Sequence, residues 1–300
     1  MQHKVYGVVV TYNPDIALFK KVIKSLGGQV DKVIVVDNFS KNISEIQILI
    51  EDSEIELIKL PKNTGIAYAQ NHGITYVQKH LADYVLLMDQ DTVLPEKSIP
   101  DLLQQCISLE KEGSKIGAIG YAYRNTHDGQ LNAVWKAHGL KLEKQCIDSK
   151  RKGLVEADFI IASGSLIPIQ TLKNIGGMEE DFFIDLVDVE WGLRARAQGY
   201  KNYTSYNRIM THTLGREQKK FLWRNITIHN PISNYYSIRN SIFLAKRPYI
   251  GWVWRLHYLR RIFPYFIIFS VFPDQRWVRV KRMVQGLRDG IFNRSGSIVK

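Results

Sequence analysis

The first ninety residues alternate between short apolar runs and longer amphipathic stretches. Runs rich in Val, Ile and Leu occupy residues 4–12, 32–38, 55–60 and 83–91, and helix-like stretches occupy residues 15–28, 43–52 and 65–81. Runs that are apolar at nearly every position are typical of strands buried on both faces. The pattern therefore predicts an α/β fold, with a parallel sheet that helices cover on both sides.

Polar residues close three of these apolar runs, at residues 11–13, 37–38 and 89–91. In parallel sheets, ligands bind outside the carboxyl ends of the strands. We therefore expect a binding site where these three segments meet.

The pattern becomes mixed beyond residue 114. Residues 115–123 and 158–169 predict strands, and a short helix is expected near residues 170–177. Residues 188–200 fit two patterns, because their apolar positions alternate as in a strand but also recur at helical spacing before Gly199. The sequence leaves both readings of this segment open.

Length and composition fit a well-packed protein, since 300 residues with 45% hydrophobic content can form one large α/β domain with an appendage or two modest domains. No segment reads as a signal peptide, and no apolar run reaches the roughly 18 to 20 residues of a membrane span. The only cysteines, Cys106 and Cys146, form no C-x-x-C motif. This favours a reducing, cytoplasmic setting and argues against a metal site built from cysteine.

The positive charge is concentrated at the C-terminal end, which predicts a division into residues 1–215 and residues 216–300. The second part carries 17 Lys and Arg against three acidic residues, whereas the first carries 24 against 26. Aromatic residues are interleaved with the basic ones, and the longest apolar run, residues 262–272, contains Pro264. A solvated basic face and a nucleic-acid-binding module are alternatives. We favour a helical extension that lies on a membrane surface, because Trp, Tyr, Lys and Arg suit the headgroup layer.

Asp89 and Asp91 form a D-x-D motif at the end of a buried strand. Such a pair is common in solvated turns. At the carboxyl end of a central strand, however, two carboxylates also suit Mg²⁺ or Mn²⁺ shared with a diphosphate, or one of them suits a ribose hydroxyl.

Further candidates lie in the first half of the chain. Asp37 either caps a turn or accepts a hydrogen bond from a nucleoside, and Asn63 precedes a helix whose free N–H groups suit an anion. Gly65, Ala69 and Gly73 form a small-residue face that allows close helix packing.

Six segments follow the order found in family 2 glycosyltransferases: "VVVTYNP", "VVDNFS", "NTGIAYAQNHGI", "LLMDQDT", "FFIDLVDVEWGLRARAQGY" and "NYYSIRN". Over roughly residues 4–245 the chain resembles the rhamnosyltransferase branch of that family. The resemblance implies the GT-A fold, which joins a Rossmann-like nucleotide-binding sheet to a mixed sheet on the acceptor side. It also implies an inverting hexosyltransferase whose nucleotide-sugar donor is dTDP-L-rhamnose and whose cofactor is Mn²⁺ or Mg²⁺. By position it assigns nucleotide binding to Thr11, Tyr12, Asn13, Asp37, Asn63, Gly65 and Asp89, metal binding to Asp91 and His212, and catalysis to Asp188.

The chain departs from the wider family at two points. Val187 and Asp188 stand where a Glu-Asp pair is common, so Asp185 and Glu190 remain alternatives to Asp188 as the base, and an N-cap remains the structural alternative for Asp188. The Q-x-x-R-W motif of processive members is absent from the sequence. We therefore expect the addition of one or a few sugars.

Two other side chains are open to more than one interpretation. His212 is either a structural residue at a strand end or a ligand for Mn²⁺. Arg239 either belongs to a buried ion pair or contacts phosphate.

The chemistry of an inverting transfer agrees with this set. A base must take the proton of the acceptor hydroxyl, and a divalent cation stabilises the departing diphosphate. The basic, aromatic extension suggests a saccharide acceptor on a lipid diphosphate, used in cell-surface polysaccharide synthesis at the inner face of the membrane.

A sugar-nucleotide nucleotidyltransferase is the nearest alternative enzyme, but the first strand is followed by residues 11–14 rather than by a glycine-rich, basic loop. A Rossmann dehydrogenase would need G-x-G-x-x-G at that turn. No recognised nucleic-acid motif accompanies the basic tail.

Overall fold

The computed structural model describes residues 3–51, 53–126, 129–145, 152–212, 217–221, 224–228 and 230–298. Cys106 is buried and free, whereas Cys146 lies outside these residues. The division predicted between residues 215 and 216 also falls outside them and remains a prediction.

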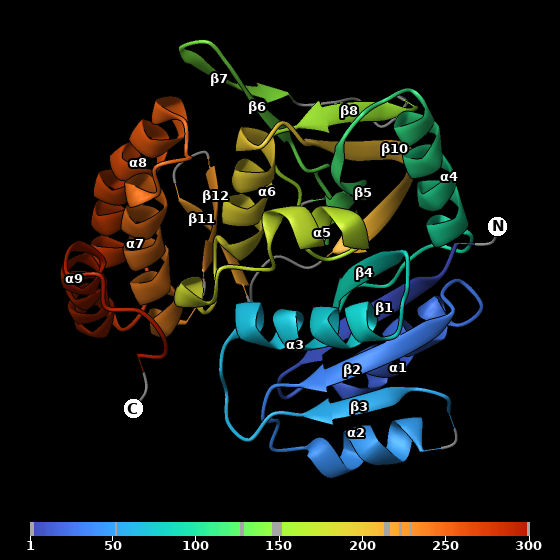
Figure 1. Ribbon diagram of the computed structural model, residues 1–300. Helices are drawn as coiled ribbons and strands as arrows, with labels where there is room; N and C mark the ends of the chain where they lie inside the picture. Colours follow the sequence, from blue (N-terminus) through green and yellow to red (C-terminus); the bar gives the residue numbers. More distant parts are fainter. Residues whose placement is uncertain are drawn as a thin grey trace.

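One mixed sheet of eight strands forms the centre of the protein, in the order β3-β2-β1-β4-β9-β5-β10-β8 (Figure 1). β3, β2, β1 and β4 are mutually parallel, β9 is antiparallel to β4 and β5, and β10 is parallel to β5 and antiparallel to β8. The strands are β1 (Val5–Thr11), β2 (Lys32–Asp37), β3 (Glu56–Lys59), β4 (Tyr84–Asp89), β5 (Ile116–Asn125), β8 (Leu154–Ala157), β9 (Ser165–Pro168) and β10 (Lys201–His212). The predicted parallel sheet and its mixed continuation are therefore confirmed.

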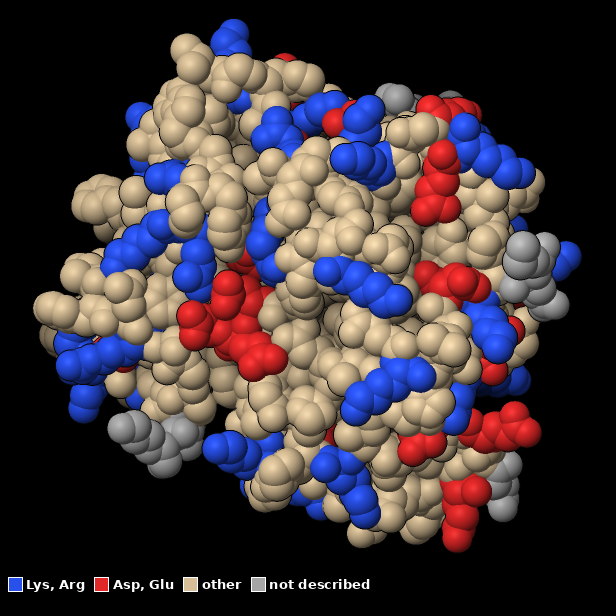
Figure 2. Space-filling model, in the orientation of Figure 1, with Lys and Arg blue, Asp and Glu red and all other residues tan. Residues whose placement is uncertain are grey.

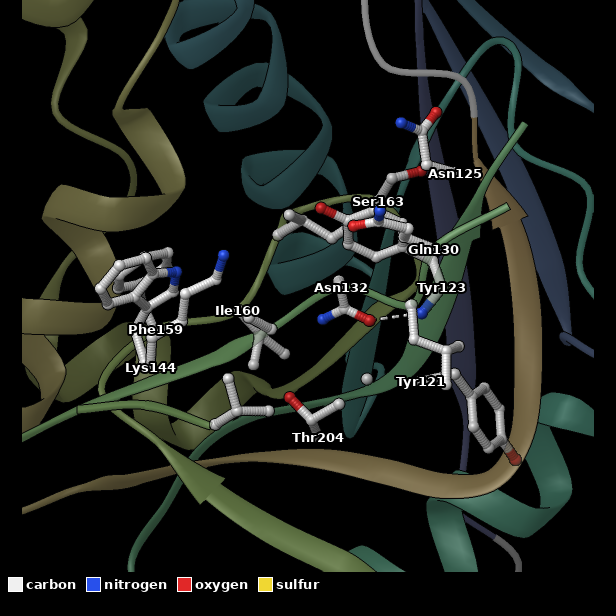
Figure 3. Close-up of a pocket in the computed structure, with 16 residues that line it drawn as sticks. Tyr121, Tyr123, Asn125, Gln130, Asn132, Lys144, Phe159, Ile160, Ser163 and Thr204 are labelled. Atoms are coloured by element: carbon white, nitrogen blue, oxygen red, sulfur yellow. Dashed lines mark hydrogen bonds between the residues drawn. The ribbon is translucent and has the colours of Figure 1, made fainter. Parts of the chain in front are cut away.

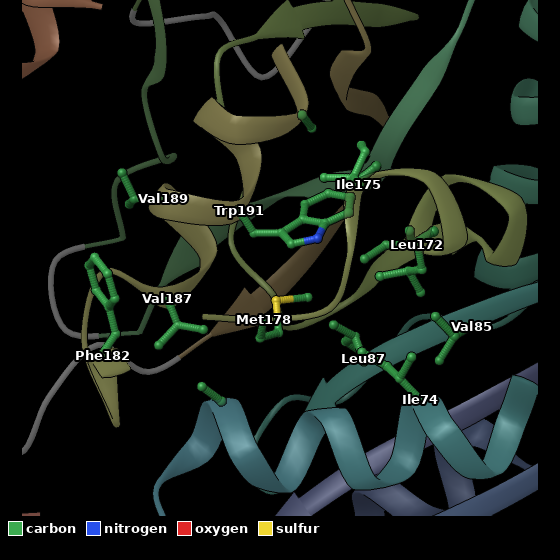
Figure 4. Close-up of a cluster of buried hydrophobic side chains, with 14 of the residues drawn as sticks. Ile74, Val85, Leu87, Leu172, Ile175, Met178, Phe182, Val187, Val189 and Trp191 are labelled. Atoms are coloured by element: carbon green, nitrogen blue, oxygen red, sulfur yellow. The ribbon is translucent and has the colours of Figure 1, made fainter. Parts of the chain in front are cut away.

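Helices cover both faces of this sheet, as the apolar strands require. One face packs against α1 (Ile16–Leu26), α2 (Ile43–Ile50) and α4 (Ser98–Lys111). The other packs against α3 (Ile66–Lys79), α5 (Ile169–Ile175) and α6 (Val187–Ala197). Figure 4 shows part of this second core, where Leu87 of β4 and Ile74 of α3 lie near Met178 and Trp191.

Close packing of α3 depends on one glycine of the predicted small-residue face. A Cβ at Gly73 would lie 2.3 Å from Cγ1 of Val8, so α3 could not approach β1 as closely with any other residue there. Gly65 instead precedes the helix as its N-cap, with φ at 88°.

Two segments refine the sequence predictions. The strand expected over residues 158–169 is limited to β9, because residues 159–164 form a loop that turns toward the end of β4. The ambiguous segment 188–200 is helical, as α6. Apolar residues occur on most sides of this helix because it is buried around most of its circumference, and this produces the alternation in the sequence. Gly199 follows the end of the helix with φ at 82°.

The C-terminal part contains a hairpin of β11 (Glu217–Phe221) and β12 (Arg224–Ile228), followed by α7 (Pro231–Lys246), α8 (Trp252–Val271) and α9 (Arg276–Ile291). These helices pack together beside α6 (Figure 1). A second hairpin, β6 (Val134–His138) with β7 (Lys141–Gln145), projects from the mixed half of the sheet. Within the described residues, no helix combines the length and apolar character needed to cross a membrane.

Candidate active site

The strand register brings the polar segments predicted from the sequence to one edge of the sheet. Thr11 pairs with Asp37 across β1 and β2, and Val10 pairs with Asp89 across β1 and β4. Because β5 and β10 run in the same direction as β4, their carboxyl ends reach the same edge. The predicted meeting of these segments is therefore confirmed.

Within the described part of the chain, the D-x-D carboxylates form no ion pair at this edge. The N–H of Asp89 donates to Oγ of Ser163 over 3.0 Å. Loss of hydration and the charge of Asp91 raise the pKa of Asp89 to about 7. Oδ1 of Asp91 is buried and has no hydrogen-bond partner among the described residues.

These properties fit a divalent cation. A cation would favour the ionised form of Asp89 and supply a partner for the orphaned oxygen of Asp91, and hard oxygen ligands suit Mg²⁺ and Mn²⁺. No group of three His, Cys, Asp or Glu residues gathers around a metal position in the described part of the chain. Asp89 and Asp91 could supply two oxygen ligands of such an ion.

His212 is the last residue of β10, and its side chain lies outside the description. The backbone places it near the D-x-D motif, because its neighbour Thr211 forms a β-bridge with Val93. Metal binding by His212 remains a prediction.

Asp188 lies in the first turn of α6 and is not its N-cap. The N-cap is Leu186, with φ at 61°, so the structural alternative for Asp188 is wrong. Burial raises the pKa of Asp188 to about 6, although N–H groups of Val189 and Ala162 bond to the carboxylate and lower it. The negative charges of Asp185 and Asp89 raise it further. Asp188 therefore belongs to the same electrostatic site as the D-x-D motif.

The two alternative bases differ from Asp188. Glu190 is fully buried, and both of its oxygens bond to Arg194, at 2.8 and 3.0 Å. Tyr249 also donates to Glu190, so this carboxylate has a structural role in the core. Asp185 is exposed and precedes the helix, with φ at 71°.

The predicted nucleotide-binding residues after β1 and β2 hold each other in place. The hydroxyl of Thr11 donates to Asp37 over 2.9 Å, and the N–H of Ser40 donates to the other oxygen of Asp37. Asn13 accepts from the N–H of Lys41. The carboxylate of Asp37 thus caps a turn, and its nucleotide contact remains a prediction.

Tyr12 lies beside the metal candidates and is 47% exposed as a residue. Gln90, between the two D-x-D carboxylates, binds both backbone groups of Tyr12: its Oε1 accepts from the Tyr12 N–H at 2.7 Å and its amide donates to the Tyr12 carbonyl.

Asn63 and Gly65 form a tight turn before α3. Oδ1 of Asn63 accepts from the N–H of Gly65 at 3.0 Å and from the amide of Asn38. Asn38 in turn accepts from the N–H of Thr64. A Cβ at Gly65 would lie 2.5 Å from the carbonyl oxygen of Phe183, so the turn requires glycine there.

A pocket of about 320 Å³ borders this site on the mixed half of the sheet (Figure 3). Ser163, which accepts from the N–H of Asp89, is part of its wall, and so is Tyr123, whose pKa rises to about 12 through burial and the charge of Asp188. Its other lining residues include three amides and an aromatic pair with a nearby cation: Asn125, Gln130, Asn132, Trp135, Phe159 and Lys144. Lys144 lies 5.9 Å from the ring centre of Trp135.

Within the described part of the chain, the hydrogen-bond partners of Arg239 are backbone carbonyls and a side-chain amide rather than the carboxylate of a buried ion pair. It is fully buried, and its guanidinium donates to the carbonyl oxygens of Asp181, Phe182 and Gly296 and to Oδ1 of Asn240. It therefore ties together segments of backbone.

The sequence did not single out Ser163, Tyr123 or Asn240. Ser163 lies in "ASGS", a small polar run inside an otherwise apolar segment, and that interruption is a usable signal for a loop. Tyr123 carries no comparable local signal, and Asn240 ends the segment "NYYSIRN" quoted above without a separate signal for its contacts.

The mixed sheet, the polar ends of its parallel strands and the D-x-D motif agree with the class expected from the sequence, a GT-A glycosyltransferase. The comparison with known proteins agrees with this class. The model of the family described as "Glycosyl transferase family 2" matches residues 8–163, so the chain belongs to that family and is a glycosyltransferase. It is also 30% identical, over 250 residues, to the dTDP-rhamnosyl transferase RfbF of Shigella flexneri, covering 83% of this chain and 82% of that protein.

Solved structures agree on the fold. TarS 1–349 of S. aureus in complex with UDP-GlcNAc matches with a TM-score of 0.60 at 14% identity, covering 96% of this chain and 80% of that chain. GalNAc-T7 with UDP, GalNAc and Mn²⁺ matches with a TM-score of 0.57 at 10% identity, covering 90% of this chain and 58% of that chain. The predicted GT-A fold and enzyme class are confirmed.

Proposed function

We propose that the protein transfers L-rhamnose from dTDP-L-rhamnose to a hydroxyl of a saccharide acceptor, with inversion and with the help of Mn²⁺ or Mg²⁺. The observation that carries this proposal is that Asp188, on α6, lies close enough to the D-x-D motif at the sheet edge for the charge of Asp89 to raise its pKa. The name of the relative from Shigella flexneri supports the donor.

In this proposal Asp91 and Asp89 hold the cation, with His212 as a further ligand. A divalent ion held there would stabilise the negative charge on the departing dTDP. Residues 11–13, Asp37 and residues 63–65 surround the nucleotide.

Asp188 acts as the base. It accepts the proton of the acceptor hydroxyl while that oxygen forms a bond to the anomeric carbon and the bond to the diphosphate breaks. With a pKa near 6, Asp188 is ionised at neutral pH and is still basic enough to take a proton.

A thermal-shift screen of nucleotide sugars, with and without Mn²⁺, tests the donor. A ligand that binds only the folded protein raises its melting temperature. We expect dTDP-L-rhamnose to give a larger shift than UDP-GlcNAc, and EDTA to remove most of it. An equal response to both sugars would refute the donor, and an unchanged shift in EDTA would refute the metal.

Paired variants test the base. Asp188→Asn should abolish turnover while dTDP still binds, and Asp185→Asn should keep most of the activity because Asp185 is exposed. The reverse pattern would move the base to Asp185.

We assign the acceptor saccharide to the pocket beside Ser163. Amide side chains and aromatic rings are suited to sugar hydroxyls and sugar faces, and the pocket opens next to the proposed base. Trp135→Ala should raise KM for the acceptor at least tenfold and leave KM for the donor within about twofold. A change confined to the donor KM would instead assign the pocket to the donor sugar.

We further propose that α8 and α9 rest on the inner face of the cytoplasmic membrane, where a lipid-diphosphate-linked acceptor would be found. Apolar side chains form a stripe along α8 at helical spacing, and others line α9: Trp252, Leu256, Leu259, Phe263, Ile267 and Val271, with Trp277, Val284, Leu287 and Ile291. Exposed cations flank them, among them Arg260, Arg261, Arg276, Lys281 and Arg288. Figure 2 shows Lys and Arg over the side of the molecule formed by these helices, with uncharged surface between them. This mixture favours an anionic bilayer over a second copy of the chain, whose equally basic face would repel it.

Flotation with vesicles of phosphatidylglycerol and phosphatidylcholine tests this face. Phe263→Ser combined with Trp277→Ser should abolish flotation, because these side chains are 72% and 86% exposed. Leu140→Ser, which removes a 75% exposed side chain from the β6–β7 hairpin, is the control. Failure of the wild-type chain to float, or self-association lost in the double variant, would refute the membrane role while leaving the transferase intact.

A further inference from the structure

The segment that leads into α6 has an unusual backbone. Phe183, Asp185 and Leu186 all have positive φ, at 62°, 71° and 61°. The N–H of Ile184 donates to the carbonyl of Phe182 over 2.7 Å, and with ψ of Phe183 at −62° this is a classic-type γ-turn, which is rare and strained. Such a conformation persists only when its surroundings hold it in place.

Two consecutive residues of α7 provide that hold. The amide nitrogen of Asn240 lies 2.7 to 3.0 Å from the carbonyl oxygens of Phe182, Ile184 and Asp185. Nη2 of Arg239 donates to the carbonyl oxygens of Asp181 and Phe182, at 3.0 and 2.9 Å. Both side chains are fully buried, so these bonds are shielded from water.

The Arg239 guanidinium is itself fixed from several directions. It lies 4.9 to 5.3 Å from the ring centres of Tyr235, Tyr236 and Phe243, and its Nε donates to Oδ1 of Asn240. An arginine held by rings and carbonyl groups presents a rigid set of donors.

The held segment reaches both parts of the active site. Two residues after Leu186 comes Asp188. On the other side, the carbonyl of Phe183 accepts from the N–H of Ile66 at 2.7 Å, next to the turn at Gly65. The Phe183 ring also stacks on Tyr236, with centroids 5.1 Å apart.

We propose that Arg239 and Asn240 are positioning residues for the catalytic base. They hold residues 181–186, of which Phe183, Asp185 and Leu186 have positive φ, and this fixes where α6 begins and where the Asp188 carboxylate lies. Neither residue touches a substrate. The inference rests on the proposed function, because it takes Asp188 as the base.

Asn240→Ala tests the proposal, and Asn234→Ala is its matched control. Asn234 is also fully buried on α7, but its partners are Tyr265 of α8 and Arg279 of α9. Both variants should lower the melting temperature. Turnover of dTDP-L-rhamnose, followed as release of dTDP, should show kcat reduced at least tenfold in Asn240→Ala and within threefold of wild type in Asn234→Ala.

Binding of dTDP separates positioning from donor recognition. The Kd of Asn240→Ala for dTDP should stay within about threefold, because the Gly65 turn keeps its own bonds to Asn63. Asn240→Asp, which removes the donor amide at nearly constant shape, should show the same loss of kcat and replaces Asn240→Ala should that variant not fold.

Three results would overturn the proposal: wild-type kcat in the Asn240 variants, equal loss of kcat in Asn234→Ala, or loss of dTDP binding without loss of kcat. An active Asp188→Asn variant would refute the base itself and so identify a failure of the proposed function rather than of the positioning pair.

Discussion

Replacing Asp188 with Asn is expected to stabilise the folded protein at neutral pH and to abolish its activity. In the folded protein the pKa of Asp188 is about 6, against about 3.9 for an unperturbed Asp side chain. Above pH 6 the carboxylate is ionised in both states, but its burial and the charges of Asp185 and Asp89 make ionisation costlier in the folded state. This difference in pKa corresponds to a cost of about 3 kcal/mol in the stability of the wild-type protein at neutral pH. Asn carries no charge, so the variant does not have this cost.

The pH dependence of this gain has a definite sign. Between about pH 4 and pH 6, Asp188 is more often protonated in the folded state than in the unfolded state. The stability of the wild-type protein therefore falls as the pH rises through this range. The penalty is fully present above the folded pKa. Asp188→Asn should therefore be more stable than wild type by about 3 kcal/mol at pH 7.5 and by about 1 kcal/mol at pH 4.5.

Urea unfolding of both proteins in EDTA, at these two pH values, measures the difference. Glu112→Gln, which removes an exposed carboxylate, should change stability by less than about 0.5 kcal/mol at both pH values. The reasoning would be refuted if Asp188→Asn were no more stable than wild type at pH 7.5, or if its gain were the same at pH 4.5.

Three further outcomes are expected. In a pH–rate profile with saturating donor, kcat should fall about tenfold per pH unit below about pH 6, because the base must be ionised; a flat profile down to pH 5 would exclude a base with this pKa. Gly73→Ala should cost about 1–3 kcal/mol in urea unfolding, because its Cβ would lie 2.3 Å from Val8 Cγ1; an unchanged midpoint would show that α3 can move away. Ser163→Ala should lower kcat/KM about tenfold, because the N–H of Asp89 loses its acceptor, and should change the stability by no more than about 1.5 kcal/mol. Unchanged kinetics would show that Ser163 has no role in the reaction.

The nucleotide half of the fold was predictable because its signals are local. Strands β1, β2 and β4 are apolar at nearly every position, and this pattern specifies a sheet covered on both faces. Once the strands are parallel, their polar ends must share an edge. The D-x-D motif and the segment after β1 could therefore be placed together from the sequence.

The mixed half of the sheet could not be predicted in the same way. Residues 158–169 look like one strand, yet Ser163 reaches Asp89 through a loop 74 residues away along the chain. In α6, burial around the helix removes the contrast between faces on which a helical pattern depends. The contacts of Asn240 with residues 182–185, which are 55 to 58 positions away, leave no trace in local sequence.

The site gathers several features that weaken a fold. Asp188 and Asp89 are carboxylates whose ionised forms are disfavoured, Oδ1 of Asp91 lacks a partner among the described residues, and the segment before α6 is left-handed at three positions. Each such feature persists only where neighbouring structure compensates for it. Two buried polar side chains of α7, Arg239 and Asn240, bond to that segment, whereas α8 and α9 expose apolar stripes to solvent. On these contacts α7 belongs with the catalytic body, and the proposed membrane-facing role is confined to the two helices that follow it.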